Sequence, residues 1–252
     1  MSGHSKWSTI KHSKAISDAK RGKVFTKLTR EIISAARQGG GSTDMNVRLR
    51  MAVQRARDNN MPVDNIDRAI KRATGDGGDN DQMVEVVYEG YGPGGTAILL
   101  QTITDNKNRT VSDIRSTLTK AGGNLAQTGS VAWQFEQKGV VVVEADPDQA
   151  EELALIAIDA GADDFETFES TLHLYSAPEK MEEIRKTLAE SDAKIQSSEI
   201  SMLPSIAVSL EDKAALQTLR LLDRLEELDD VQRVFSNADF SDNVLEQYSN
   251  EE

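Results

Sequence analysis

The chain has 252 residues, of which 38% are hydrophobic and 28% charged, the balance of a protein that can bury a core in water. At this length we expect two or three domains. The sequence contains no cysteine, which excludes disulfides, thiolate zinc sites and cysteine nucleophiles. It also contains no apolar run long enough to cross a bilayer or to serve as a secretory signal, so we expect a cytoplasmic protein with no membrane partner.

The formal charge of −13 is distributed unevenly along the chain. Residues 1–75 hold 16 Lys and Arg against six Asp and Glu, a formal charge of +10, so the other 177 residues carry −23. This asymmetry predicts a basic amino-terminal region that binds polyanions. The acidic remainder is expected to resist nonspecific adhesion to the same polymers.

Residues 1–75 are predicted to form three short helices. The first spans about residues 20–37 and ends at the glycines 39–41. Pro62 is placed to open the third helix. Apolar residues recur at helical spacing in all three segments. The side chains expected inside this bundle are Phe25, Leu28, Ile32, Ala35, Leu49, Ala52, Val53, Ala56, Ile66, Ala69, Ile70 and Ala73.

Basic side chains occupy the other sides of these helices. The first helix lacks most of the acids that would pair with them at i, i+4, and like charges three or four residues apart repel one another. The basic stripe therefore costs stability unless an anionic partner neutralises it, which favours nucleic-acid binding over a solvated surface. The predicted nucleic-acid-binding residues are Lys6, Trp7, Lys11, Lys14, Lys20, Arg21, Lys23, Lys27, Arg30, Arg37, Arg48, Arg50, Arg55, Arg68, Lys71 and Arg72.

The segment 76–82 is predicted to be an acidic linker, and a hairpin follows it. Apolar β-formers at residues 84–87 and 97–103 flank a turn in which glycines surround Pro93. Glycine permits the positive φ angles that a tight reversal needs. We therefore expect two paired strands here.

The hairpin is expected to lead into a helix and a third strand. Thr110 and Asp113 have capping-box spacing, so the helix is predicted to begin there and to end at Gly122. Residues 124–135 are predicted to return as a strand. Its alternation would place on one buried face Val131, Trp133 and Phe135.

A second α/β unit begins at Gly139. In chain order we expect a strand at 140–143, a helix marked by apolar residues at 150–157 and ending at Gly161, two strands within 164–176, a helix opened by Pro178 and a strand at 195–202. This βαββαβ order is that of ferredoxin-like domains. His173 alternates with leucines in its strand, so we expect it on the solvent side.

Residues 206–240 contain a further strand, helix and strand, which we expect to return and complete the central sheet. The predicted fold class is α+β with three domains. They are a small helical bundle at 1–80, a central α/β sandwich at 81–135 plus 206–240, and an inserted ferredoxin-like βαββαβ domain at 136–205. The polar tail 241–252 is expected to fray.

Candidate catalytic residues are sparse. The three histidines lack a second ligand at metal spacing, and the glycine turn is not followed by the Gly-Lys-Ser/Thr of a phosphate-binding loop. We therefore expect no enzyme, metal, cofactor or small-molecule substrate. One polar cluster at the junction between a strand and a helix either binds a ligand or hydrogen-bonds its own loop. Its members are Asp105, Asn106, Asn108 and Arg109.

Several short motifs occur in order along the chain. They include Gly3-His-Ser-Lys-Trp7, Lys20-Arg-Gly-Lys23, Asn59-Asn60-Met61, Thr104-Asp-Asn-Lys-Asn-Arg-Thr110, Gly122-Gly-Asn-Leu125 and Ser198-Glu-Ile-Ser-Met-Leu-Pro204. Through these motifs residues 2–240 resemble the YebC/PmpR family, the bacterial relatives of the mitochondrial translational activator of cytochrome c oxidase subunit I. The resemblance implies three domains, a helical amino-terminal domain and no known catalytic activity. The chain departs from the family pattern at residues 42–44, where a proline-containing turn is usual, and this affects only the loop between the first two helices.

Two functions remain open at this stage. The resemblance and the basic region together predict a non-enzymatic, DNA-binding transcriptional regulator. The alternative is a ribosome- or rRNA-binding translation factor that activates or rescues elongation. The second helix offers Arg48, Gln54 and Arg55 for base contacts, but no helix-turn-helix signature is clear. The sequence leaves the target, the oligomeric state and the sign of regulation open.

Overall fold

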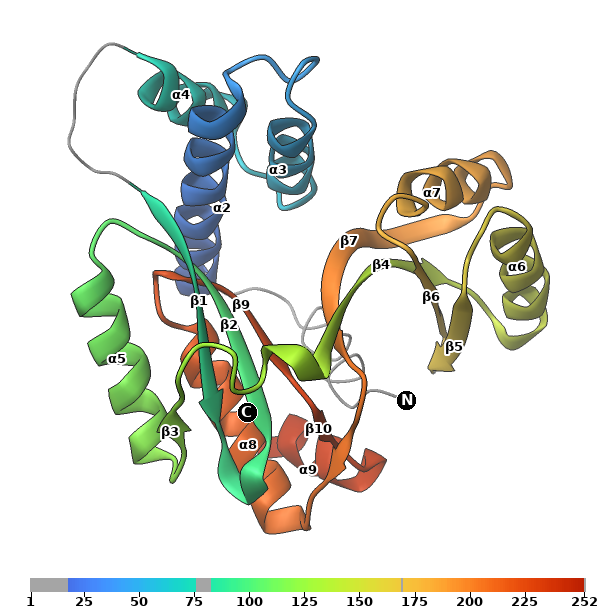
Figure 1. Cartoon of the computed structure of the whole chain (residues 1–252). Helices are drawn as coiled ribbons and strands as arrows, with labels where there is room; N and C mark the ends of the chain where they lie inside the picture. The colour runs from blue at the N-terminus through green and yellow to red at the C-terminus, as the bar shows by residue number, and fades with distance from the viewer. Residues whose placement is uncertain (1–17, 76–82, 169, 252) are drawn as a thin grey trace. The chain divides into compact units, whose positions relative to one another are not determined.

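The computed structural model describes residues 18–75, 83–168 and 170–251, with the backbone alone at residues 18–20, 147, 148 and 251 (Figure 1). The described residues divide into two compact units. Residues 18–132, 210–236 and 242–251 form the larger unit, and residues 133–209 with 237–241 form the smaller one. The expected linker at 76–82 lies outside the described residues. We retain as a proposal the division of the chain into three domains at the boundaries expected from the sequence.

The larger unit begins with a three-helix bundle (Figure 1) made of α2 (Asp18–Gly39), α3 (Val47–Asp58) and α4 (Val63–Thr74). The apolar stripes predicted from helical spacing meet inside it. The most deeply buried side chains include Leu28, Ile32, Leu49, Ala56 and Ile66. Phe25, Ile70 and Ala73 pack around them and remain partly exposed. The prediction of an amino-terminal helical bundle is therefore confirmed.

The buried side chain of Asn46 joins two helices of this bundle. Its Oδ1 accepts a hydrogen bond from the backbone N–H of Leu49 at 3.0 Å, which caps the start of α3. Its Nδ2 donates to the carbonyl oxygens of Ala35 and Gly40, each at 2.8 Å, at the end of α2. One amide thus caps the start of α3 and ties it to the end of α2.

An antiparallel sheet forms the centre of the larger unit. Its strands are β1 (Val84–Tyr91), β2 (Ala97–Thr104), β3 (Asn124–Leu125) and β9 (Val231–Ser236), in the order β3-β1-β2-β9. Gly94 and Gly95 have φ angles of 69° and 77° in η1 (Pro93–Gly95), which makes the predicted reversal. Helix α8 (Asp212–Glu226) lies behind this sheet in Figure 1, and it contacts β9 and α5 (Lys107–Lys120).

Helix α5 begins earlier than the capping-box spacing indicated. Its N-cap is Asn106, whose Oδ1 accepts from the backbone N–H of Arg109 at 3.1 Å. Thr110 is instead a buried residue of the first turn. The capping-box prediction was wrong because a second capping residue lies four positions upstream and reaches the free N–H groups first.

The predicted strand at 124–135 is also wrong. Only β3 pairs with the sheet, and the chain ends this segment in η2 (Ala132–Gln134), where Trp133 is 69% exposed. The buried carboxylate of Glu89 explains the difference. It accepts the backbone N–H groups of Gly129 and Val131 at 2.6 Å and of Ala132 at 2.9 Å, so these groups have no need of a neighbouring strand.

The smaller unit contains the predicted βαββαβ order. Its elements are β4 (Phe135–Glu144), α6 (Pro147–Asp159), β5 (Asp164–Phe168), β6 (Thr171–Ser176), α7 (Met181–Glu190) and β7 (Lys194–Pro204). All pairs are antiparallel in the order β5-β6-β4-β7, which confirms the ferredoxin-like arrangement and the α+β fold class. A short parallel pair, β8 (Val208–Ser209) and β10 (Ala238–Asp239), completes this unit.

His173 is buried, which corrects its expected place on the solvent side of β6. The strand is interior to the sheet, so Val142 of β4 and Glu166 of β5 flank the imidazole. Its Nε2 lies 3.2 Å from Thr171 Oγ1. Burial lowers the pKa of His173 more than the nearby Glu166 raises it.

The carboxyl-terminal tail is helical, although its polar composition predicted fraying. Residues Asp242–Glu251 form α9, with Val244 and Leu245 buried. Tyr248 donates a hydrogen bond from its hydroxyl to the carboxylate of Asp223 in α8. Two apolar residues in adjacent positions were too few to reveal a helical period in the sequence. Their burial nevertheless anchors the first turn of α9 to the unit.

We expect Asn46→Ala to destabilise the larger unit more than Asn106→Ala. Both changes remove an N-cap, at a cost of about 1 kcal/mol. Asn46→Ala also removes the hydrogen bonds to the carbonyl oxygens of Ala35 and Gly40, each worth about 0.5–1.5 kcal/mol. Urea unfolding of both variants would measure the difference. Equal losses in the two variants would contradict a joining role for Asn46.

Candidate nucleic-acid interface

The predicted nucleic-acid-binding residues fall into three groups in the structure. Lys6, Trp7, Lys11 and Lys14 lie outside the described residues, and Lys20 is described by its backbone alone. A second group, on α2, contacts the carboxyl end of α8. The third group is exposed or half-buried on the bundle and consists of Arg21, Arg37, Arg48, Arg50, Arg55, Arg68, Lys71 and Arg72.

The second group is Lys23, Lys27 and Arg30. Lys27 and Lys23 donate to the carbonyl oxygens of the last residue of α8 and of the residue after it, the latter at 3.4 Å. Arg30 Nη1 donates to the carbonyl oxygen of Asp229 at 2.7 Å. The last carbonyls of a helix lack intrahelical donors and carry the negative end of its dipole, so cations stabilise them. These three residues therefore have an internal partner that the repulsion argument did not anticipate, and their binding of nucleic acid stays a prediction.

Asp230 is the centre of the polar contacts in this region. Its side chain is buried, with the whole residue 5% exposed. It forms ion pairs with Arg30 and with Arg109, the latter at 2.9 Å. Thr110 Oγ1 donates to its carboxylate at 2.7 Å and Thr104 Oγ1 at 3.2 Å. Nothing in the sequence distinguishes this acid from the 41 others, because all four donors lie far from it along the chain.

The polar cluster expected at the start of α5 belongs largely to the same network. Arg109 Nη2 also donates to Asp105 Oδ1 at 2.6 Å, while Asn106 caps the helix. Asn108 is exposed beside them. Three of the four members thus serve loop hydrogen bonding and capping, and ligand binding by the cluster stays a prediction.

The pKa of Asp230 is lowered by these contacts. Burial alone would raise it, but the hydrogen bonds from Thr110 and Arg109 and the charge of Arg30 outweigh burial. A carboxylate whose pKa is lower in the folded state contributes stability above its unfolded pKa of about 3.9, and that contribution is lost as the pH falls through the folded value.

Within the third group, two arginines are neutralised by carboxylates of the same unit. Arg48 pairs with Glu85 at the start of β1, and Arg55 Nη1 pairs with Glu31 Oε1 of α2 at 2.6 Å. These ion pairs join α3 to α2 within the bundle and to strand β1 of the sheet. The two arginines contribute less to the field outside the molecule than their number suggests.

The remaining exposed cations on the second and third helices define what we call the basic α3–α4 surface. It consists of Arg50, Arg57, Arg68, Lys71 and Arg72. Arg50 donates to the backbone carbonyl oxygens of residues 43 and 44, and Arg68 Nη2 donates to Asn65 Oδ1 at 2.9 Å. Neutral acceptors leave the positive charge in place. Arg57 was absent from the predicted site, but its seven-residue spacing from Arg50 puts both on one face of α3.

Among residues 18–75, 83–168 and 170–251, no three or more His, Asp or Glu side chains are grouped so as to hold a metal ion. No helix in the same ranges is long and apolar enough to span a bilayer.

We expect Asp230→Asn to reduce the free energy of unfolding by about 3 kcal/mol at pH 7, because it leaves Arg30 without its buried counter-ion. The deficit relative to the parent should begin to shrink below about pH 4, where the carboxylate of the unfolded parent becomes protonated, and should go on shrinking toward the lower pKa of the folded state. Urea unfolding between pH 3 and pH 7 would measure it, with the exposed Asp229→Asn as a matched control. A deficit that did not change with pH would contradict this role for the charge.

Comparison with known proteins identifies the family. The family model described as the TACO1/YebC protein N-terminal domain matches residues 5–76, and the model of the TACO1/YebC second and third domain matches residues 83–238. A protein named as a probable transcriptional regulatory protein in Dehalococcoides mccartyi is 53% identical over 248 residues, 98% of each chain. A protein of the same description in Halothermothrix orenii is 49% identical over 255 residues, the whole of both chains.

A solved structure agrees with these sequence matches. The crystal structure of a conserved hypothetical protein from Aquifex aeolicus superimposes with a TM-score of 0.85 at 41% identity, over 94% of this chain and 98% of that one. The family models together match nearly the whole length, and the structural match extends over the same elements. The chain belongs to the TACO1/YebC family.

Proposed function

We propose that this chain is a non-enzymatic, cytoplasmic regulator of gene expression that binds nucleic acid through the basic α3–α4 surface. The observation that carries the proposal is the exposure of five cations on two adjacent helices, of which Arg50 and Arg68 bind neutral acceptors. Clustered Lys and Arg on one helical unit are the electrostatic footprint of a phosphate-binding surface. Because relatives are named as probable transcriptional regulatory proteins, we propose DNA as the polymer and transcription as the process.

The charges of α4 favour phosphate contacts over base contacts. In a helix-turn-helix protein, the amino-terminal residues of the recognition helix reach the base edges. Here that end of α4 presents the exposed carboxylates Asp64 and Asp67, which would repel the flanking phosphates. The cations Arg68, Lys71 and Arg72 come later in the helix. Phosphate contacts fix position and affinity but carry little sequence information.

The same feature supports a second candidate function, binding to ribosomal RNA in translation. Folded RNA is recognised largely by shape and by backbone contacts, and side chains cannot read its deep major groove. A surface that contacts phosphates without reading bases suits rRNA as well as duplex DNA. In this case the chain would act on the ribosome to activate or rescue elongation.

We expect Arg57→Gln/Arg68→Gln/Lys71→Gln to weaken nucleic-acid binding strongly at moderate salt. Each lost phosphate contact should reduce the slope of log K against log salt by about 0.9 for duplex DNA and about 0.7 for single strands. The loss should be about equal across sequences if only the backbone is touched. The matched control is Lys107→Gln/Arg115→Gln/Lys120→Gln, which removes three exposed cations from α5 instead.

Binding should be measured against duplex DNA, structured RNA and whole ribosomes at several salt concentrations. A folded α3–α4 variant that binds all three like the parent would remove this surface from the mechanism. A parent that prefers ribosomes to duplex DNA at physiological salt would replace transcription by translation as the process. A parent that binds none of these polymers would overturn the proposed function as a whole.

A further inference from the structure

The smaller unit carries an unusual run of negative charge. Between Lys138 and Lys180 the sequence holds 11 Asp and Glu and no Lys or Arg. This stretch contains α6, β5 and β6. A surface of one sign attracts partners of the opposite sign and speeds their association. By charge alone, this part of the chain repels nucleic acid and anionic lipid.

Apolar side chains are exposed within the same stretch. Leu155 and Ile158 of α6 are 65% and 43% exposed, and Phe165 of β5 is 39% exposed. The opposite side of α6 is already buried, through Ala150, Ala154 and Ala157 among others. The two outer residues are therefore not needed for packing the helix on its sheet.

These three apolar residues lie on neighbouring elements. Leu155 and Ile158 are three positions apart, so they share one side of α6. Phe165 pairs with Leu174 of β6, whose side chain lies in the core. Residues paired across strands point to the same face, so Phe165 points to the face on which α6 packs against β5. Figure 1 shows α6 alongside β5 at the margin of the sheet.

Carboxylates surround the apolar residues of α6. Glu151 and Glu152 are exposed one helical turn before Leu155, and Asp159 is exposed one turn after it. Their positions at i−4, i−3 and i+4 make them the nearest neighbours of Leu155 on the helix surface. We call Leu155, Ile158 and Phe165 with these three carboxylates the α6 surface.

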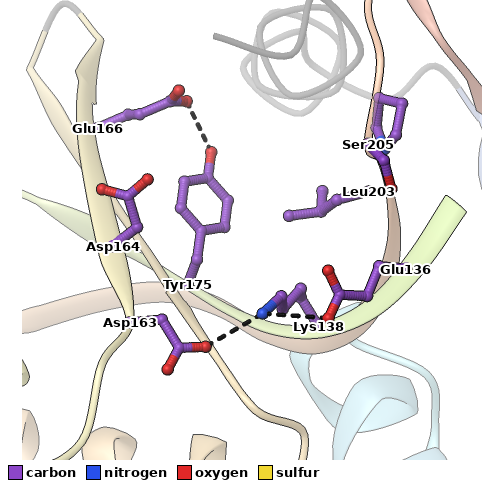
Figure 2. Close-up of a pocket in the computed structure, with 9 residues that line it drawn as sticks. Glu136, Lys138, Asp163, Asp164, Glu166, Tyr175, Leu203 and Ser205 are labelled. Carbon is purple, nitrogen blue, oxygen red and sulfur yellow. Dashed lines mark hydrogen bonds and ion pairs between the residues drawn. The ribbon is translucent and has the colours of Figure 1, made fainter.

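The sheet face away from α6 holds a related but distinct group. A cavity of about 280 Å³ is lined there by Lys138, Asp163, Glu166 and Tyr175, among others (Figure 2). Several of these polar groups already contact one another. Lys138 Nζ lies 3.2 Å from Asp163 Oδ2, and Tyr175 Oη donates to Glu166 Oε2 at 2.9 Å. The α6 surface differs because, within the described part of the chain, none of its three carboxylates pairs with a cation, and because it has apolar side chains to bury.

We propose that the α6 surface binds a basic arm of another protein, an amphipathic segment whose Lys and Arg flank apolar side chains. The carboxylates select a cationic partner, and the exposed leucine, isoleucine and phenylalanine select one with apolar groups, which excludes a simple polyamine. A hydrophobic centre inside a charged rim is the usual arrangement of a protein interface. Basic arms are common on proteins that bind nucleic acid. Such a partner would bind the smaller unit of this chain while both proteins bind the same nucleic acid, which the acidic unit itself repels.

The test uses the full-length protein and three labelled probes. The first is a Lys/Leu peptide that forms an amphipathic helix, the second is oligolysine of the same charge, and the third is a Glu/Leu peptide of the same pattern. The parent should bind the Lys/Leu peptide more tightly than oligolysine and should not bind the Glu/Leu peptide. Leu155→Ser/Ile158→Ser should weaken the Lys/Leu complex about tenfold or more, because two apolar side chains no longer become buried. Its binding to oligolysine should be unchanged.

Two matched controls distinguish binding at this surface from nonspecific adsorption of the probes. Val87→Ser/Ile206→Ser removes two exposed apolar side chains elsewhere and should leave every probe unaffected. Glu151→Gln/Glu152→Gln/Asp159→Asn should weaken both cationic probes several-fold and flatten their salt dependence. Glu182→Gln/Glu183→Gln/Glu190→Gln, on α7 of the same unit, should do so much less.

Two outcomes would overturn the proposal. The first is a folded Leu155→Ser/Ile158→Ser variant that binds the Lys/Leu peptide like the parent. The second is concentration-dependent self-association of the parent in sedimentation equilibrium that this variant abolishes, because a second copy of the chain would then be the occupant. Neither outcome bears on nucleic-acid binding by the basic α3–α4 surface, which is measured with other variants.

Discussion

The buried carboxylate of Asp230 is the constraint on which the larger unit depends. An ion removed from water is strongly destabilising unless protein donors replace its hydration. Here the donors come from three different elements: Arg30 of α2, Thr104 at the end of β2, and Arg109 with Thr110 of α5. Each element must be in place for the carboxylate to be satisfied, so the strand β9 that follows it is held at a defined position beside β2.

The contacts of α2 with residues 226–230 also determine which cations of the bundle face outward. The same side of α2 that carries Arg30 places Lys23 and Lys27 on the carbonyl groups at the end of α8. A stripe of like charge on a helix is therefore compatible with a purely internal role, provided that a helix terminus supplies the opposite partial charge. The cations of α3 and α4 that bind neutral acceptors are the better basis for a nucleic-acid interface.

The smaller unit has a surface of the opposite character. Its edge strand β5 carries Asp164 and Glu166, and charge on an edge discourages pairing with strands of other chains. That explains part of the acidity, but it does not account for the apolar side chains on α6. Two kinds of macromolecular partner, one anionic and one cationic, are consistent with the two surfaces.

The sequence by itself determined the elements whose evidence is local. Helical spacing predicted the buried sides of α2, α3 and α4, glycines around Pro93 predicted the hairpin, and the order of apolar runs predicted the βαββαβ unit, because each pattern reflects neighbours within a few residues. The motifs along residues 2–240 likewise indicated the family, and the domain matches and relatives agree with it.

Only the tertiary structure decided the roles that depend on distant partners. Glu89 receives N–H groups from about 40 residues away, which is why residues 124–135 are not a strand. Asp230 receives donors from 120 to 200 residues away, and the same folding turns Lys23, Lys27 and Arg30 from free cations into a helix cap. Sequence patterns report the period of an element, whereas the partner of a charge is set by which elements pack together, and no local pattern carries that information.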